Sequence, residues 1–297
     1  MNKEIKQLAI IGPTASGKTD LAIKTAKSID AYILSIDSLS IYKEIDIVSA
    51  KPSKVEMQGI KHFGIDVLNP NEHFGVDILI DIYKEVKELC EKNKKNLIIV
   101  GGTSFYLKSL LNGLSILPHM NKKVKEKVTF KLKNLQKTYD DLLKIDPLYM
   151  SNINCSDAYR IEKALLIYEA SGICASEWFK KNPPKPIIQN LDIYNIEVKR
   201  DILRQRIAKR TKQMLRLGLI DEVCLLEKKY TRLPNSMGAI GIVEVLQYLD
   251  GYTSKDEMIQ NISTHTAQLA KRQDTFNRTQ FENITSDSLK ELEKLLT

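Results

Sequence analysis

The chain has 297 residues, of which 43% are hydrophobic and 28% charged, and this balance excludes a disordered or fibrous protein. No apolar run approaches the roughly 18 residues of a membrane span, and the first residues show no signal peptide, so we expect a cytosolic protein without a membrane partner. The formal net charge of +8 favours a polyanionic partner such as nucleic acid, although a generally lysine-rich composition would give the same charge.

Strands and helices alternate in the first third of the chain. Short apolar runs rich in β-branched residues predict buried strands at residues 8–11, 32–36 and 96–100. Between them, residues 19–28 and 76–92 have the spacing of amphipathic helices. Uninterrupted apolar strands that alternate with helices are typical of an α/β protein with a doubly wound parallel sheet.

The pattern changes near residue 118. Residues 122–137 carry seven lysines on a helical pattern, residues 159–170 predict another helix, and the next strand is expected only at residues 191–198. The last hundred residues read as helical and basic. We therefore expect residues 1–117 to form the first part of an α/β core, residues 118–188 an inserted helical domain, and residues 189–297 the return to the core with basic C-terminal helices.

A phosphate-binding loop follows the first predicted strand. The segment fits the pattern G-x-x-x-x-G-K-[ST] completely, and a helix is expected directly after it, which indicates a P-loop NTPase-like core. Glycines let successive backbone N–H groups face one centre, and the helix N-terminus adds positive potential there. The lysine supplies a charge to a terminal phosphate, and the final hydroxyl can hold Mg²⁺. The residues expected to bind a diphosphate or triphosphate are Gly12, Pro13, Thr14, Ala15, Ser16, Gly17, Lys18 and Thr19.

The acid that a P-loop ATPase carries at the end of a second strand is missing. The strand at residues 96–100 ends in Gly101-Gly102-Thr103 instead, and the acid found at a strand end is Asp37. Parallel sheets present ligand-binding groups at the carboxyl ends of their strands, so Asp37 is a candidate general base or substrate anchor. The alternative is a residue that only caps a helix or turn.

These motifs together resemble those of the tRNA dimethylallyltransferase (isopentenyltransferase) family. The resemblance is carried by the P-loop, by Asp37-Ser38 through Ala50-Lys51-Pro52, by Gly101-Gly102-Thr103, and by the arginines from Arg206 to Arg210. It continues through Leu217-Gly218-Leu219, Glu222-Val223, Gly241 and Ala270-Lys271-Arg272-Gln273, and so covers most of the chain in order. Only the helical middle matches poorly.

The resemblance implies a transferase that moves a dimethylallyl group from dimethylallyl diphosphate to N6 of adenosine 37, next to the tRNA anticodon. It implies that the P-loop binds the diphosphate with Mg²⁺, which Thr19 would help to hold. Asp37 would be the base, Thr103 would contact substrate, and Arg210 would lie near the diphosphate. The residues expected to bind the anticodon stem-loop are Asp37, Ser38, Leu39 and Ser40 in the core, and Lys125, Tyr159, Arg160 and Lys163 in the helical domain.

Departures from the family pattern concern the expected tRNA surface. Gly241 is followed by Ile242 and Val243 where the family usually has a tyrosine and a basic residue, which weakens the expectation of tRNA contacts from that helix. Lys163 stands where an arginine is usual and loses bidentate geometry toward phosphate.

Two other functions remain open at this stage. One is a P-loop kinase of a small metabolite or nucleoside, with Asp37 deprotonating an acceptor hydroxyl. The other is an RNA-binding module with a vestigial P-loop. We expect a monomer.

Overall fold

The computed structural model describes residues 5–297, which divide into two compact units. The first unit is the described part of Met1–Leu110 together with Ile188–Thr297, and the second is Leu111–Ile187. The second unit begins earlier than residue 118 because residues of the connecting segment form hydrogen bonds with its last helix and the residue after it. The Ser115 hydroxyl donates to the Asn182 carbonyl over 2.6 Å, and the Trp178 indole N–H donates to the Ile116 carbonyl over 2.9 Å.

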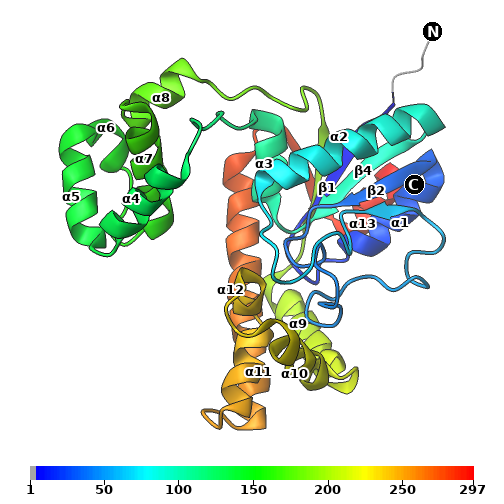
Figure 1. Ribbon diagram of the computed structural model, residues 1–297. Coiled ribbons are helices and arrows are strands. Elements are labelled where there is room, and N and C mark those ends of the chain that lie inside the picture. Colours follow the sequence, from blue (N-terminus) through cyan, green and yellow to red (C-terminus); the bar gives the residue numbers. More distant parts are fainter. Residues whose placement is uncertain (1–4) are drawn as a thin grey trace. The chain divides into compact units, whose positions relative to one another are not determined.

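A six-stranded, entirely parallel sheet forms the centre of the first unit (Figure 1). Its spatial order is β3-β2-β4-β1-β5-β6, so the first strand lies inside the sheet. In register, Ile10 of β1 pairs with Val100 of β4 on one side and with Tyr194 of β5 on the other. The strands are β1 (Gln7–Ile11), β2 (Ala31–Ser35), β3 (His62–Phe63), β4 (Asn96–Gly101), β5 (Asp192–Glu197) and β6 (Ile284–Ser288).

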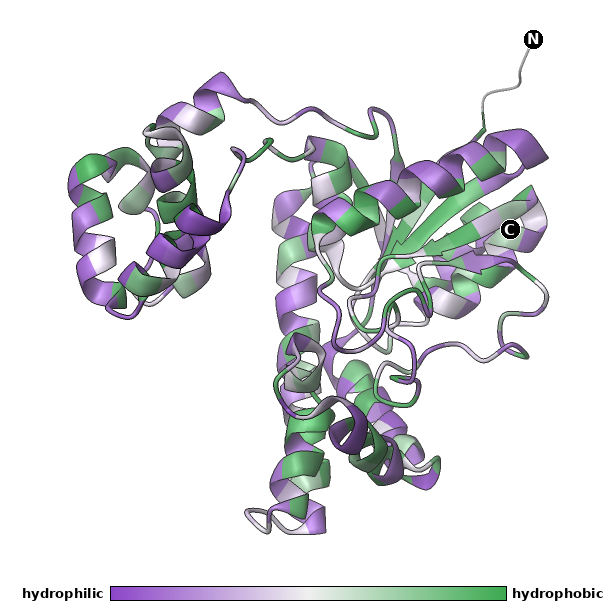
Figure 2. Ribbon diagram, viewed as in Figure 1, coloured by the Kyte–Doolittle hydropathy of each residue, from purple (hydrophilic) through white to green (hydrophobic). Residues whose placement is uncertain are grey.

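Helices cover both faces of this sheet, which explains why the inner strands are apolar throughout. The side chains of Leu8 and Ile10 pack with Leu21 of α1 (Lys18–Ile29) and Leu292 of α13 (Leu289–Leu296) on one face. On the other face the Tyr83 hydroxyl of α2 (Val76–Asn93) donates to the Gln7 side chain over 2.8 Å. Figure 2 shows the inner strands coloured as hydrophobic along their length. This is the expected doubly wound α/β fold.

The first unit contains helices before and after the second unit in the sequence. They are α1 (Lys18–Ile29), α2 (Val76–Asn93), α3 (Ser104–Asn112), α9 (Arg200–Arg216), α10 (Leu219–Tyr230), α11 (Ile242–Leu249), α12 (Lys255–Gln280) and α13 (Leu289–Leu296), with a short 3₁₀ helix at Asn235–Gly238. Among residues 5–297, no helix is both long and apolar enough to cross a membrane.

The second unit is helical and has a core of its own. Val128, Leu142, Met150, Ile161 and Leu165 are buried together at its centre. Its helices are α4 (Lys122–Leu132), α5 (Leu135–Ile145), α6 (Pro147–Met150), α7 (Ala158–Ser171) and α8 (Ala175–Lys181).

Two of the differences from the sequence-based expectation have a clear local cause. The lysine-rich segment 122–137 is interrupted after Lys133, because the Asn134 side chain accepts the N–H of Lys137 and starts a second helix. The strand β6 was not predicted within the helical C-terminal third. Its sequence, Ile-Thr-Ser-Asp-Ser, is mostly exposed at the sheet edge and therefore lacks the apolar pattern by which buried strands are identified.

Candidate active site

The carboxyl ends of β1, β2 and β4 meet at one edge of the sheet, and a cavity of about 1240 Å³ opens there. Parallel strands place their carboxyl ends on the same edge, so the P-loop after β1, Asp37 after β2 and Gly101-Gly102 at the end of β4 converge. All three segments contribute to the cavity wall. Expected site residues far apart in sequence thus face one space.

The P-loop connects β1 to α1 and leaves hydrogen-bond donors available to an anion. Gly12 and Gly17 have φ angles of +152° and +100°, and a side chain at Gly12 would press against the Ile196 carbonyl at 3.2 Å. Gly17 caps α1 without a side-chain hydrogen bond, so the N–H groups of the first turn have no protein cap. The buried Ser16 hydroxyl also has no partner among residues 5–297. These free donors favour a negatively charged ligand.

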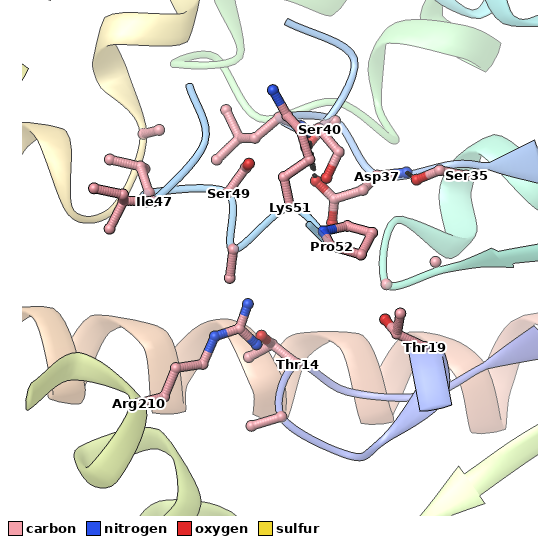
Figure 3. A pocket seen from close by; sticks show the side chains of 18 of the residues that line it. Thr14, Thr19, Ser35, Asp37, Ser40, Ile47, Ser49, Lys51, Pro52 and Arg210 are labelled. Atoms are coloured by element: carbon pink, nitrogen blue, oxygen red, sulfur yellow. Dashed lines mark hydrogen bonds between the residues drawn. The ribbon is translucent and has the colours of Figure 1, made fainter. Parts of the chain in front are cut away.

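Lys18 and Arg210 bring two positive charges to this loop. The Lys18 ammonium donates to the Pro13 carbonyl over 2.7 Å. Burial lowers the pKa of Lys18 from 10.5 to about 8, while the Asp37 carboxylate opposes this shift and the Arg210 guanidinium adds to it. Burial also lowers the pKa of Arg210, against the attraction of Asp37 and Glu56. Figure 3 shows Arg210 and Asp37 on opposite sides of the open space.

Asp37 uses one of its two carboxylate oxygens to hold its own loop. Its Oδ1 accepts the backbone N–H of Leu39 over 2.9 Å and that of Ser40 over 3.2 Å. Its Oδ2 makes no hydrogen bond within residues 5–297, and the side chain lines the cavity (Figure 3). The turn-capping role and the chemical role are therefore compatible, because each has its own oxygen. Ser38, Leu39 and Ser40 line the same cavity.

The end of β4 contributes backbone rather than side chains. Gly101 and Gly102 line the cavity, but Thr103 is not among its lining residues. The Thr103 carbonyl accepts the N–H of Tyr106 at the start of α3. Thr103, which is expected to contact the substrate, thus lies next to the cavity and not in its wall.

An aromatic wall stands beside the polar groups. Tyr42, Phe74 and Tyr106 line the cavity, and the rings of Phe74 and Tyr106 lie 5.0 Å apart. His62 lines it too, with Nδ1 2.8 Å from the Ile60 carbonyl. Burial lowers the pKa of His62, and its buried Nε2 has no partner within the described chain. This wall gives an apolar group a place next to the charged loop.

The loop that carries the Ala-Lys-Pro motif is fixed by two charged side chains. The ammonium of Lys51, whose side chain is 6% exposed, donates to the Tyr42 carbonyl over 2.8 Å and pairs with Asp46 and Asp66. From α10, the Glu222 carboxylate accepts the backbone N–H groups of residues 46, 47 and 48 over 3.0, 2.7 and 3.0 Å. Lys51 lines the cavity, as Figure 3 shows, so this motif builds the cavity wall.

The other residues expected to bind tRNA belong to the helical unit. Lys125 on α4 is exposed and makes no ion pair among residues 5–297. On α7, Tyr159 is 68% exposed and the Lys163 ammonium lies 5.3 Å from its ring centre. Arg160 pairs with Asp157 at 3.1 Å. Unlike these residues, Ile242 of the core is fully buried, so the side chain at this unusual position packs inside.

Three contacts at the site were not predicted from the sequence. The Gln273 side chain on α12 accepts the Thr14 N–H over 2.8 Å, and Arg206 on α9 reaches the Ala15 and Ser16 carbonyls at 3.4 and 3.3 Å. Glu222 is the third. All three residues stand in motifs of the noted resemblance, but only the fold shows what they touch.

Comparison with known proteins gives one consistent result. The family model described as IPP transferase matches residues 40–280. The tRNA dimethylallyltransferase of Sulfurimonas denitrificans is 67% identical over 290 residues, which make up 98% of each chain. That of Sulfurovum sp. is 58% identical over 297 residues, covering 100% of this chain and 99% of the relative. The solved tRNA isopentenylpyrophosphate transferase of Bacillus halodurans matches with a TM-score of 0.72 and 30% identity, over 99% of this chain and 95% of that one.

Proposed function

The chain belongs to the IPP transferase family, and we propose that it transfers a dimethylallyl group from dimethylallyl diphosphate to N6 of adenosine 37 in tRNA. The observation that carries this proposal is the single cavity in which an uncapped P-loop, two cationic side chains and the free oxygen of Asp37 face one another. A phosphate site, a base and an apolar wall are what such a transfer requires.

In the proposed reaction, the bond between the allylic carbon and the diphosphate oxygen breaks as a bond from N6 to that carbon forms. The P-loop N–H groups, Lys18 and Arg210 stabilise the charge that develops on the leaving diphosphate. An adenine amino group is a poor nucleophile because its lone pair is delocalised into the ring, and Asp37 Oδ2 takes the proton that N6 loses as the new bond forms. The aromatic wall at Tyr42, Phe74 and Tyr106 keeps water from the cationic allylic carbon.

The residues present fit a Mg²⁺ ion held largely by the substrate. No group of three or more His, Cys, Asp or Glu side chains within the described chain could hold a metal. Mg²⁺ is commonly held by one or two protein oxygens together with substrate phosphates. The Thr19 hydroxyl lines the same cavity as Asp37 and would supply such an oxygen (Figure 3). When bound, the ion would neutralise part of the diphosphate charge.

For the RNA substrate, we propose the anticodon stem-loop, bound through residues 37–40 and through Lys125, Tyr159, Arg160 and Lys163. The exposed ring of Tyr159 offers a stacking surface for a base, and the lysines and the arginine offer charge to phosphates. Taking the adenine out of its stack costs a few kcal/mol, less in a loop than in a duplex. We also propose that the protein works as a monomer in the cytoplasm, where tRNA is modified.

One experiment tests this function. The protein is mixed with dimethylallyl diphosphate, Mg²⁺ and total tRNA, and the digested nucleosides are analysed by mass spectrometry. We expect isopentenyladenosine, and far less of it in the same time when Asp37→Asn replaces the wild type. Turnover of ATP with a small acceptor, and no modified nucleoside, would instead support a P-loop kinase.

A further inference from the structure

The Gln273 side chain joins two parts of the phosphate site that are far apart in the sequence. It extends from α12, and its Oε1 accepts the Thr14 N–H over 2.8 Å, a contact that spans 259 residues. Its Nε2 lies against the end of β4, where a Cβ on Gly102 would come within 2.5 Å of it. Thr14, Gly102 and Gln273 all line the cavity. The carboxamide thus fills the space between the P-loop and the neighbouring strand end.

We propose that Gln273 sets the number of phosphates that the site accepts, admitting a diphosphate and excluding a triphosphate. This inference rests on the proposed prenyl transfer and names the residue that adapts a nucleotide-type loop to a shorter ligand. The role is one of specificity and differs from that of the groups that contact the leaving diphosphate.

The supply of hydrogen-bond donors in the loop favours a short ligand. A P-loop binds phosphates through consecutive backbone N–H groups, and a donor that is already paired inside the protein is not offered to an anion. Gln273 removes the Thr14 N–H from the cradle, and the Ser16 N–H is paired with the Pro13 carbonyl over 3.3 Å, whereas the first turn of α1, the Ser16 hydroxyl and the Lys18 ammonium can still donate to an anion. The remaining donors gather at the helix end of the loop.

The group at the end of β4 also disfavours a triphosphate. P-loop enzymes that act on triphosphates place a carboxylate at a strand end to hold the Mg²⁺ that bridges the outer two phosphates. In this chain that strand end is glycine, and the amide of Gln273 occupies the adjacent space. An amide holds Mg²⁺ less well than a carboxylate does. The space beside Gly102 is therefore filled, and the strand end lacks the carboxylate that would hold the Mg²⁺ of a triphosphate.

Contacts on both sides keep the P-loop from opening to admit a longer ligand. Arg206 donates to the Ala15 and Ser16 carbonyls from the α9 side, and Gln273 holds Thr14 from the α12 side. Ala15 is kept at a φ of +62°, which a non-glycine residue adopts only when its surroundings enforce it. The loop is thus fixed at both flanks of its tip.

The test compares two inorganic ligands, pyrophosphate and tripolyphosphate, both with Mg²⁺, by titration calorimetry. We expect the wild type to bind pyrophosphate about tenfold or more tightly than tripolyphosphate, the effect of about one hydrogen bond to a charged group. Gln273→Ala frees the Thr14 N–H and empties the space beside Gly102. We expect it to abolish most of this preference, mainly by strengthening tripolyphosphate binding.

Two further variants serve as controls. Gln268→Ala changes an exposed glutamine on the same helix and should keep the wild-type ratio. Gln273→Asn withdraws the amide by one methylene and is used if Gln273→Ala does not fold. It should also lower the ratio of pyrophosphate affinity to tripolyphosphate affinity. Because the ratio is taken within each variant, a general loosening of the site cancels.

The possible results separate this inference from the proposed function. An unchanged ratio in the Gln273 variants, or equal binding of both ligands by the wild type, overturns the role of Gln273 while prenyl transfer by the wild type still stands. Absence of pyrophosphate binding together with absence of transfer would overturn the proposed function itself.

Discussion

Asp37 shows how one side chain can serve structure and chemistry at once. Its Oδ1 holds the N–H groups of Leu39 and Ser40, and its Oδ2 faces the cavity without a protein partner. An asparagine at this position keeps an acceptor for both N–H groups but cannot take a proton. The substitution therefore separates the two roles more cleanly than removal of the side chain would.

For Asp37→Asn we expect the single-turnover transfer rate to fall about 10²- to 10⁴-fold. Melting temperature and the affinities for tRNA and donor should change far less, because the turn is retained. Asp37→Ala is the matched control: it loses the turn as well and should also lose about 1 kcal/mol of stability. Transfer by Asp37→Asn at nearly the wild-type rate would rule out Asp37 as the base.

Lys18 gives the site a pH dependence whose direction follows from its lowered pKa. Burial is the main cause of that shift, and the free protein loses the Lys18 proton near pH 8. A diphosphate favours the protonated ammonium, so binding is strongest below pH 8 and requires proton uptake above it. The donor itself contributes little there, since a phosphate monoester has its last pKa near 6.

We therefore expect donor affinity to be constant from about pH 7 to 8 and then to decrease by about tenfold per pH unit. Calorimetry in buffers of different ionisation enthalpy should detect the proton taken up. Lys18→Arg remains charged throughout this range and should show a flat profile, whatever its absolute affinity. A wild-type profile as flat as that of Lys18→Arg would contradict this account of the cation.

Among the elements, the loop of residues 42–53 depends on groups outside itself. Glu222 lies in the first turn of α10 and accepts three consecutive N–H groups of this loop, from residues 46 to 48. Lys51 holds the same loop from within. The position of this part of the cavity wall therefore depends on Glu222 and Lys51.

Glu222→Gln replaces one of the accepting oxygens with an amide that faces N–H donors. We expect a loss of about 1 to 3 kcal/mol in the free energy of unfolding, and a KM for tRNA that rises more than kcat falls. Asp221→Asn removes a neighbouring exposed carboxylate from the same helix turn and should leave both quantities nearly unchanged. Equal effects of the two variants would show that only the charge at the helix start matters.

Local patterns predicted those parts of the fold and site whose cause is local. The apolar runs at β1, β2 and β4 and the glycine spacing of the P-loop were sufficient to predict a parallel sheet that has the P-loop and Asp37 at the carboxyl ends of its strands. The polar edge strand β6 carries no such pattern, because most of its side chains face solvent. The contacts of Gln273 and Glu222 span 259 and 174 to 176 residues, and no local spacing encodes them.

At the scale of the whole molecule, lysines that are paired with a carboxylate must be distinguished from lysines that are not. The formal net charge of +8 includes seven lysines between residues 122 and 137. Lys127 and Lys131 both pair with Glu169, whose side chain is only 6% exposed. Lys125 lies on the same helix, closer to its start. It is exposed and has no carboxylate partner in the described chain. Only lysines of the second kind have a full charge to offer to RNA.

The salt dependence of tRNA binding measures this difference directly. Each phosphate neutralised by a protein cation contributes about −0.7 to the slope of log K against log salt for single strands and about −0.9 for a duplex. We expect the wild-type slope to be steep, and Lys125→Gln to make it shallower by about one such unit while donor affinity stays unchanged. Lys127→Gln removes the same charge from the same helix. Because the Lys127 charge is already paired with Glu169, this substitution should leave the slope unchanged and should instead lower the stability of the helical unit. Equal losses of slope in both variants would show that Glu169 releases its lysines to the RNA, and a flat wild-type dependence would show that the basic helix is only a solvated face.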